Sequence, residues 1–346
     1  MVKIALVGCG SFAQKQHLRQ YSALEDRVEL VAFVDPDSER ASEFRKRVGT
    51  GEVCRDISEL PGPDGLDYVD VCVPHRFHLP IGLSLLKAGH NVLLEKPMAL
   101  STDECDQLIG AADHNHVRLG VGMHTRFNSS WVAVREFVRS GKSGVPLFAS
   151  AAFNSSLASF HKGGGAATPW RGSAEGGGGA LVDLGIYAAD FFAWTFGDPL
   201  RVQAMRLAKS PSDPAGGQRG SEMTGFITAE LKGGVVVSIQ ATWDYPEAKL
   251  PPALDDKGFS CRIVCERGVL LVADHTQGGR PAFYSTESDE PIPLEMPDVE
   301  PELSQVVSSA EKRDEFPVSG REGRRSVAFI EAALDSIASG RAVTPR

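Results

Sequence analysis

A glycine-rich turn near the start of the chain narrows the range of folds open to it. Residues 3–7 (KIALV) are a short aliphatic run, which predicts a buried strand, and residues 8–13 (GCGSFA) lead into a predicted helix. In such a turn Gly8 permits the tight bend, Gly10 lets the backbone approach a pyrophosphate, and the small Ala13 lets the helix pack on the strand. The phosphates would meet the free N–H groups at the helix start. The candidate cofactor contacts in this turn are Gly8, Gly10, Ser11, Phe12 and Ala13.

An acidic residue at the end of the next strand favours this interpretation over a strand–turn–helix that binds nothing. The strand is predicted at residues 28–34, and Asp35 follows it, 22 residues after Ala13. An acid at this place binds a ribose 2′-hydroxyl in dinucleotide-binding folds. Its charge would repel a 2′-phosphate, so the sequence favours NAD, while Arg40 close by leaves NADP open.

Strands and helices alternate along the first third of the chain. Further strands are predicted near residue 53 and at 68–73, 91–94 and 117–121, with helices at 38–48, 80–88 and 102–113. This alternation predicts a parallel sheet with helices on both faces. Glu95-Lys96-Pro97 follows one strand at the carboxyl edge, where sheets of this kind bind ligands. Lys96 is therefore a candidate to face a nicotinamide, and a plain surface turn is the alternative.

Beyond residue 121 the pattern becomes a series of strands. They are predicted at 147–156, 200–208, 222–231, 234–243, 259–265 and 268–273. Consecutive strands joined by turns indicate an antiparallel or mixed sheet. Loops interrupt this sheet and are expected to shape a substrate pocket; they cover residues 160–179, 209–220 and 244–258. A last amphipathic helix is predicted at 320–339.

The loop at 160–179 and the helix after it contain candidate substrate ligands. The loop is rich in glycine and has little intrinsic order. It is either a mobile surface linker or a lid that presents Trp170 and Arg171. In the helix, Asp183 and Tyr187 are four residues apart and share a face. Asp183 either binds substrate or stabilises the helix N-terminus, with Tyr187 in the core.

Charge and composition exclude several classes of partner. Lys and Arg number 36 against 45 Asp and Glu, which gives a net charge of −9 without a basic run. Nucleic acid and anionic membranes are therefore poor partners. We expect neither a secretory signal nor a spanning helix, because no apolar stretch approaches the required ~20 residues. The six cysteines form no Cys-x-x-Cys pair, which favours a reducing cytoplasm, and no metal site is expected.

Four segments together resemble the Gfo/Idh/MocA family of oxidoreductases. They are GCGSFA at 8–13, AGHNVLLEKPMAL at 88–100, PWR at 169–171 and GGGALVDLGIY at 177–187. The resemblance implies an α/β Rossmann domain at 1–122 that binds NAD(P). It also implies an α+β domain at 123–346 with a large open-faced, mainly antiparallel sheet. That second domain would bind substrate and form homodimers or homotetramers, with the helix at 320–339 near the domain interface.

The resemblance also assigns roles to single residues. Lys96 would contact substrate and nicotinamide, and the family's Asp-x-x-x-His pattern falls on Asp183 and Tyr187. A Tyr at this place is similar to the branch with glucose–fructose oxidoreductase and dimeric dihydrodiol dehydrogenase. His75 stands where the family often has Asn or a similar small polar residue, whereas His78 matches the histidine that is usual three residues later. The cofactor contacts implied in this region are Pro74, His78, Glu95 and Lys96.

The expected activity is hydride transfer between NAD(P) and a secondary alcohol of a sugar or polyol. Tyr187 would be the acid/base; a free Tyr has a pKa of ~10, which a nearby Lys96 ammonium would lower. Asp183 would bind a neighbouring hydroxyl, and Trp170 and Arg171 would complete the substrate site. The alternatives are an NAD-dependent glycoside hydrolase on the same fold and a non-catalytic sensor.

Overall fold

The computed structural model describes residues 1–156, 169–207, 222–246, 257–272 and 280–346, which form two compact units. The first unit contains Met1–His124 and Glu300–Val327, and the second contains Thr125–Val299 and Ala328–Arg346. The sequence places the first boundary at residues 122/123 and groups the segment Glu300–Val327 with the second domain. In the structure this segment packs with the first unit.

The first unit is built on a parallel sheet of six strands. The strand order is β3-β2-β1-β4-β5-β6, and every neighbouring pair is parallel. The strands are β1 (Val2–Val7), β2 (Val28–Val34), β3 (Glu52–Cys54), β4 (Tyr68–Val71), β5 (Val92–Glu95) and β6 (Leu119–Gly122). All residues of β4 and β5 are buried, as expected for strands covered on both faces. The parallel sheet predicted from the sequence is confirmed.

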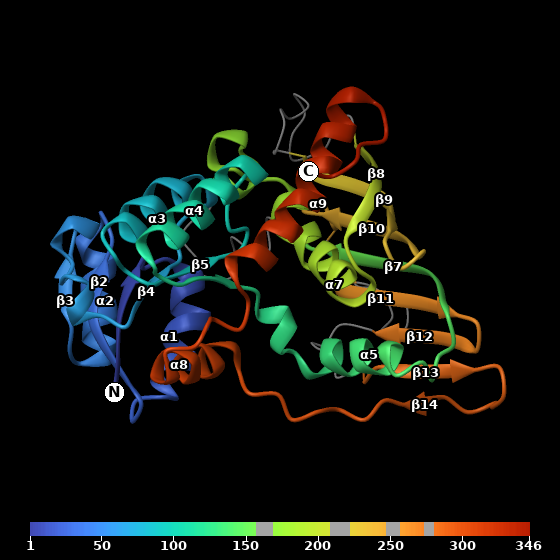
Figure 1. The fold of residues 1–346 in the computed structure, drawn as a ribbon, viewed down its shortest axis with the longest axis horizontal. Helices are drawn as coiled ribbons and strands as arrows, with labels where there is room; N and C mark the ends of the chain where they lie inside the picture. The colour runs from blue at the N-terminus through green and yellow to red at the C-terminus, as the bar shows by residue number, and fades with distance from the viewer. Residues whose placement is uncertain (157–168, 208–221, 247–256, 273–279) are drawn as a thin grey trace. The chain divides into compact units, whose positions relative to one another are not determined.

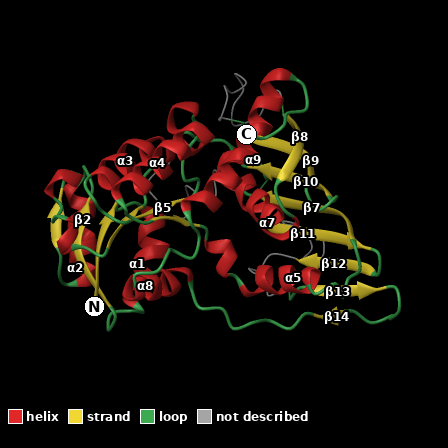
Figure 2. Ribbon diagram, viewed as in Figure 1, coloured by secondary structure: helices red, strands yellow, loops and turns green. Residues whose placement is uncertain are grey.

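Helices cover both faces of this sheet (Figure 2). They are η1 (Ala13–His17), α1 (Leu18–Ser22), α2 (Ser38–Val48), α3 (His78–Lys87), α4 (Thr102–Asn115) and α8 (Glu302–Lys312). Side chains cap two of them: Asp37 accepts the Glu39 N–H at the start of α2, and Ser101 accepts the Glu104 N–H at the start of α4.

The late segment joins the first unit through apolar contacts. Leu303 and Val307 of α8 lie in the same buried cluster as β1 and β2. Phe316 packs edge-on against Tyr68 with ring centroids 5.7 Å apart. A Cβ at Gly120 would come within 2.6 Å of the Phe316 side chain, so a glycine in β6 makes this contact fit.

The second unit is built on a mixed sheet of eight strands. The order is β14-β13-β12-β11-β7-β10-β9-β8, and all neighbouring pairs are antiparallel except β7 with β10. The strands are β7 (Pro146–Asn154), β8 (Pro199–Arg206), β9 (Thr224–Leu231), β10 (Val236–Thr242), β11 (Gly258–Cys265), β12 (Gly268–Val272), β13 (Ala282–Ser285) and β14 (Ile292–Pro293). The mainly antiparallel sheet expected for this domain is confirmed.

Helices pack on one face of this second sheet (Figure 1). They include α5 (Ser129–Arg139) and α7 (Ile186–Phe196), and Trp131 of α5 stacks on Phe259 of β11 with ring centroids 3.9 Å apart. Side chains alternate between buried and exposed along β9 and β10, so the opposite face is open. The last helix is α9 (Gly320–Ser339), whose first residues belong to the first unit and the rest to the second. Every helix in the described part of the chain is too short or too polar to cross a membrane.

Candidate functional site

The two glycines of the first turn are required for different reasons. Gly8 has a φ of +92°, and a Cβ there would lie 2.6 Å from the carbonyl oxygen of Cys72. A side chain at Gly8 would therefore strain the turn and collide with β4's end. At Gly10 no heavy atom lies within 4 Å of a Cβ position, apart from the chain neighbours. This open approach to the backbone suits a pyrophosphate at the start of η1.

Asp35 fastens the turn to the end of β2. It is buried, its Oδ2 accepts the Cys9 N–H at 2.9 Å, and its Oδ1 accepts the Asp37 N–H at 2.9 Å. Each carboxylate oxygen keeps a second lone pair with which it can accept from a ribose hydroxyl. Arg40 pairs with Asp37 at 3.1 Å, and both of these side chains are exposed. Burial, and then the Asp35 charge, raises the pKa of the Cys9 thiol above its usual range.

Lys96 lies at the carboxyl end of β5 and is buried. Its backbone N–H faces two acceptors, the Gly122 carbonyl oxygen at 3.2 Å and Glu95 Oε2 at 3.1 Å. His78 supports the same region, because its Nδ1 lies 2.7 Å from the Pro97 carbonyl oxygen. Its Nε2 lies 2.9 Å from the carbonyl oxygen of Val73. Burial lowers the pKa of His78, and a neutral ring donates to only one of these two carbonyl oxygens.

In the second unit, the described part of the glycine-rich loop is packed. Two short turns, η6 (Pro169–Gly172) and η7 (Ala174–Gly176), precede residues 177–179. A Cβ at Gly178 would collide with the Arg171 carbonyl, and one at Gly179 would lie 2.7 Å from Glu222 Oε1. A mobile surface linker is therefore wrong for residues 169–179. The remainder of the predicted lid, residues 160–168, lies outside the described residues, as do 209–220 and most of 244–258.

This packed loop brings two predicted substrate ligands together. Arg171 and Asp183 form a buried ion pair, and the Arg171 guanidinium lies 4.5 Å from the centroid of the Trp170 ring. Asp183 belongs to a π-helical turn, η8 (Leu181–Gly185), directly before α7. Tyr187 is buried at the start of α7, and its ring stacks on Phe153 with centroids 5.7 Å apart.

Glu222 is a buried carboxyl that the sequence does not predict. Its Oε1 accepts the Leu181 N–H at 2.8 Å, and its carbonyl oxygen accepts the Ala180 N–H at 2.6 Å. These bonds hold the first turn of the helix that carries Asp183. Burial raises the pKa of Glu222 to about 7. Glu222 follows a polar loop at the start of a strand, so neither periodicity nor spacing marks it.

The first unit also contains buried polar residues that the sequence does not predict. His17, Asp70 and Glu302 are each at most 4% exposed. Asp70 offers the clearest signal, because an acid stands in the apolar run of residues 68–73 (YVDVCV). In the described part of the chain, His17, Asp70 and Cys72 are a group whose metal-ligand atoms lie within 4.8 Å of one another.

Two family models match the chain. An oxidoreductase family with an NAD-binding Rossmann fold matches residues 2–123, and the Gfo/Idh/MocA C-terminal domain matches residues 131–271. The chain belongs to the Gfo/Idh/MocA family. Its first unit is thus an NAD-binding Rossmann domain, and the protein is a member of an oxidoreductase family. The open backbone at Gly10 and the acid at Asp35 fit this cofactor.

Relatives of known activity act on sugars and on a diol. D-Apiose dehydrogenase of Paraburkholderia graminis is 26% identical over 99% of this chain and 89% of that protein. The 1,5-anhydro-D-fructose reductase of Ensifer adhaerens is 24% identical over 91% of this chain and 90% of that protein. Trans-1,2-dihydrobenzene-1,2-diol dehydrogenase of Mus musculus is 30% identical over 51% of each chain.

Solved structures share the fold over the whole chain. Aldose–aldose oxidoreductase from Caulobacter crescentus, complexed with glycerol, has a TM-score of 0.82 at 22% identity and covers 99% of both chains. The WlbA dehydrogenase from Bordetella pertussis, in complex with NADH and UDP-GlcNAcA, has a TM-score of 0.81 at 22% identity. It covers 100% of this chain and 99% of its own. At such identities the likeness shows the fold alone.

Proposed function

We propose that this protein is an NAD(P)-dependent dehydrogenase or reductase that acts on a secondary alcohol of a sugar or polyol. The observation that supports it is a set of three buried polar side chains, Lys96, Asp183 and Tyr187, in a family whose characterised members include sugar dehydrogenases. Burying such polar groups costs free energy unless they are paired, as Asp183 is with Arg171.

The bound nicotinamide cofactor supplies the acceptor or donor of a hydride. We assign its phosphates to the first turn and its ribose to Asp35, while Arg40 could leave Asp37 to meet the 2′-phosphate of NADP. The residues proposed to hold the cofactor are Gly8, Gly10, Ser11, Phe12, Ala13, Asp35, Pro74, His78, Glu95 and Lys96.

In this proposal Tyr187 takes the proton of the substrate hydroxyl during oxidation and returns it during reduction. An ordinary Tyr, with a pKa of ~10, is a poor base at neutral pH. In this proposal the Lys96 ammonium would orient the same hydroxyl, and its charge would favour the ionised form of Tyr187. The Arg171–Asp183 pair offers donors and an acceptor together, which suits a neutral diol better than a carboxylate. Trp170 adds an apolar surface for the sugar carbons.

A homodimer or homotetramer through the open face of the second sheet is also part of the proposal. Large apolar side chains are exposed along its strands, among them Met205, Phe226, Phe148, Val236 and Tyr284. Patches of this kind mark association surfaces. Light scattering that shows a monomer at micromolar concentration would contradict this part. We also propose a cytoplasmic location, supported by six cysteines that stand as free thiols.

The test is a screen of aldoses, aldosides and polyols with NAD and NADP, with NADH or NADPH followed by absorbance. On the best substrate, Tyr187→Phe should lower kcat at least about 100-fold, because the acid/base is removed while the ring that stacks on Phe153 remains. Tyr284→Phe is the matched control: it removes a hydroxyl from the sheet face proposed for association but keeps the apolar ring, so wild-type activity should remain.

Three outcomes would overturn parts of the proposal. Wild-type turnover in Tyr187→Phe would remove Tyr187 from the acid/base role. Glycoside cleavage without net NADH production would favour the hydrolase alternative, and cofactor binding without any turnover across the screen would favour a sensor.

A further inference from the structure

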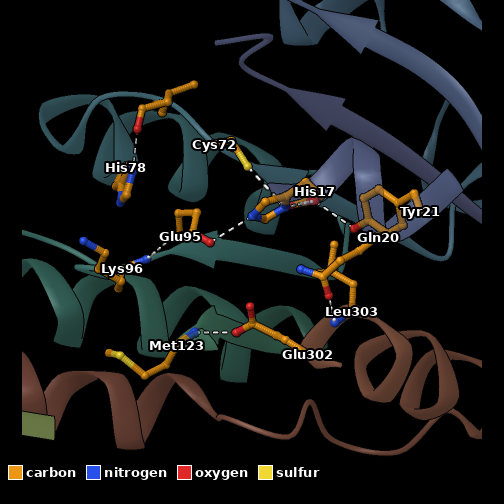
Figure 3. A network of polar contacts seen from close by, with 12 residues as sticks. His17, Gln20, Tyr21, Cys72, His78, Glu95, Lys96, Met123, Glu302 and Leu303 are labelled. Carbon is orange, nitrogen blue, oxygen red and sulfur yellow. Dashed lines mark hydrogen bonds and ion pairs between the residues drawn. The ribbon is translucent and has the colours of Figure 1, made fainter. Parts of the chain in front are cut away.

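A buried polar network lies beside Lys96 in the first unit (Figure 3). It joins His17 at the end of η1, Asp70 in β4, Glu95 at the end of β5, and Glu302 in α8. These four residues are each at most 6% exposed. A buried set of one imidazole and three carboxyls is costly unless each member is paired, so the pairing defines what the network does.

His17 stands between two carboxylates. Its Nδ1 lies 2.6 Å from Asp70 Oδ2, and its Nε2 lies 2.9 Å from Glu95 Oε1. A neutral imidazole has one N–H, and an ionised carboxylate only accepts, so both contacts together require an imidazolium. Burial opposes the charged ring, but the charge and hydrogen bond of Asp70 and the contact with Cys72 raise the pKa of His17 well above its usual range.

Asp70 Oδ2, the oxygen that faces His17, also accepts from a tyrosine hydroxyl. The Tyr21 hydroxyl donates to Asp70 Oδ2 at 2.7 Å, and the Tyr21 and Tyr68 hydroxyls lie 3.0 Å apart. Asp70 therefore anchors the imidazolium from β4, and the ring cannot turn without losing a charged hydrogen bond.

Glu95 transmits this constraint to the main chain of Lys96. While Oε1 faces His17, Oε2 accepts the Lys96 N–H at 3.1 Å. A Cβ at Gly122 would lie 2.6 Å from Glu95 Oε1, so β6 leaves room for the carboxylate only because a glycine stands there. The Glu95 carboxylate thus connects the imidazolium directly with the peptide that carries Lys96.

Glu302 supplies a carboxyl that remains protonated at neutral pH. Its Oε1 accepts the Met123 N–H at 2.6 Å. Burial, followed by the charge of Glu95, raises the pKa of Glu302 to about 8. With Glu302 neutral, the remaining charges are one imidazolium and two carboxylates. Lys96 and His124, which both lower the pKa of Glu95 through their charge, face the same group.

We propose that His17 is a positioning residue for Lys96: held as an imidazolium by Asp70, it fixes Glu95 so that the second Glu95 oxygen keeps the Lys96 peptide in place. The catalytic consequence rests on the proposed function, because it requires Lys96 to contact the substrate. The structural part of the inference stands without that function, and it can be measured without a substrate.

The first measurement is NMR of the full chain with 15N-labelled histidine, from about pH 6 to about pH 9. Both His17 nitrogens should carry protons over this range, and Asp70→Asn should let the ring lose one. A His17 ring that is neutral at pH 7 in the wild type would overturn the proposal. So would one equivalent of a bound divalent metal in elemental analysis, because a cation between His17, Asp70 and Cys72 would replace the protons.

The second measurement is hydrogen exchange at the Lys96 amide, also without substrate. In His17→Gln this amide should exchange at least about 10-fold faster relative to that of Leu94 in the same strand, because Glu95 is released. Tyr68→Phe removes a hydroxyl of the same network that touches neither His17 nor Glu95, so it should leave the ratio unchanged. An equal ratio in wild type and His17→Gln would refute the constraint; if His17→Gln does not fold, Asp70→Asn serves the same comparison.

The third measurement uses the best substrate of the sugar screen. His17→Gln should lower kcat about 10-fold or more while the KM for NAD changes less than about twofold, and the pH profile of kcat should shift. A variant that loses thermal stability but keeps kcat and its pH profile would show a purely structural role. If the wild type turns over no sugar, the proposed function fails. The histidine NMR and the hydrogen exchange at the Lys96 amide then still decide the role of His17.

Discussion

The two glycine-rich segments of this protein, one in each unit, use the same residue type in opposite ways. In the first unit, Gly10 leaves its surroundings open, since nothing but its chain neighbours lies within 4 Å of a Cβ position. In the second unit, the chain itself occupies the space that a side chain would need, because the Arg171 carbonyl lies against Gly178 and the Glu222 carboxyl against Gly179. Gly10 in the first turn leaves space for a ligand, although Gly8 beside it is packed against Cys72, whereas at Gly178 and Gly179 the chain fills the space itself.

The buried charged residues of the two units also differ in the partners that hold them. The first unit places His17 between two carboxylates on neighbouring strands of the parallel sheet. Among its described residues, the second unit has buried ion pairs of Arg171 with Asp183 and of Arg126 with Asp190. A separate buried carboxyl, Glu222, accepts a backbone N–H group. The three predictions below test this contrast.

The largest effect is expected for Gly178→Ala. Its Cβ would collide with the backbone carbonyl of Arg171, and a backbone atom cannot move aside as a flexible side chain can. We expect the free energy of unfolding to fall by about 4 kcal/mol. Urea denaturation measures it. Gly110→Ala is the control, because Gly110 lies in the middle of α4 with open space around its Cβ position. That change should raise stability by up to about 1 kcal/mol, and a neutral Gly178→Ala would contradict the packed loop.

A change of intermediate size in the free energy of unfolding is expected when the pH is raised, because Glu222 loses its proton. The pKa of Glu222 rises from the ordinary 4.5 to about 7 in the folded chain, so the native state binds this proton more tightly than the unfolded state. The stabilisation is complete below pH 4.5 and is lost as the pH rises through about 7. It amounts to on the order of 3 kcal/mol.

The free energy of unfolding of the wild type should fall between about pH 5 and about pH 8, and Glu222→Gln should lack the part of this fall that Glu222 causes. Urea denaturation at the two pH values measures it, with Glu230→Gln on the exposed sheet face as the control. Glu302→Gln should act in the first unit with the same sign, in a window that extends to about pH 8. If Glu222→Gln and wild type lose stability in parallel, Glu222 does not bind this proton in the folded chain.

The smallest effect is expected for Gly10→Ala, and it should appear in ligand binding. The Cβ meets no protein atom, so the unfolding free energy should change by less than about 0.5 kcal/mol. The Kd for NAD should rise about 10-fold, which equals about 1.4 kcal/mol, because the Cβ would stand where the pyrophosphate approaches. Calorimetric titration with NAD measures it, and Gly62→Ala, on a loop of the same unit with equally open space, is the control. If Gly10→Ala lost much stability and bound NAD as tightly as wild type, Gly10 would be a packing glycine like Gly178 and not one that leaves space for a ligand.

The sequence predicts the elements of the first unit well because their signals are local. Strands β1, β4 and β5 are short and mostly apolar, and the glycine turn directly follows β1, as Asp35 directly follows β2. The sequence does not predict α8, β13 or β14. Strand β14 consists of two exposed residues, and α8 follows Pro301 without a side-chain cap. That the segment Glu300–Val327 packs with the first unit depends on contacts such as Phe316 on Gly120, which are distant in sequence.

In the candidate site, too, the sequence predicts local relations between residues but not contacts between residues that are distant along the chain. Helical spacing places Asp183 and Tyr187 near each other, and the structure has both buried at the start of one helical segment. Nothing in the sequence predicts that Arg171 pairs with Asp183, 12 residues away, or that Glu222 binds the Leu181 N–H from 41 residues away. The contact of His17 with Glu95 spans 78 residues.

The sequence alone determined the dinucleotide turn, the alternation that gives a parallel sheet, and the change to a second kind of sheet. These features depend on backbone conformation and on apolar periodicity, which neighbouring residues set among themselves. The tertiary structure alone decided which glycines face open space, which acid holds which donor, and which carboxyls stay protonated. Those properties depend on distance through space and on burial, because the energy of a charge changes with the groups that replace its water.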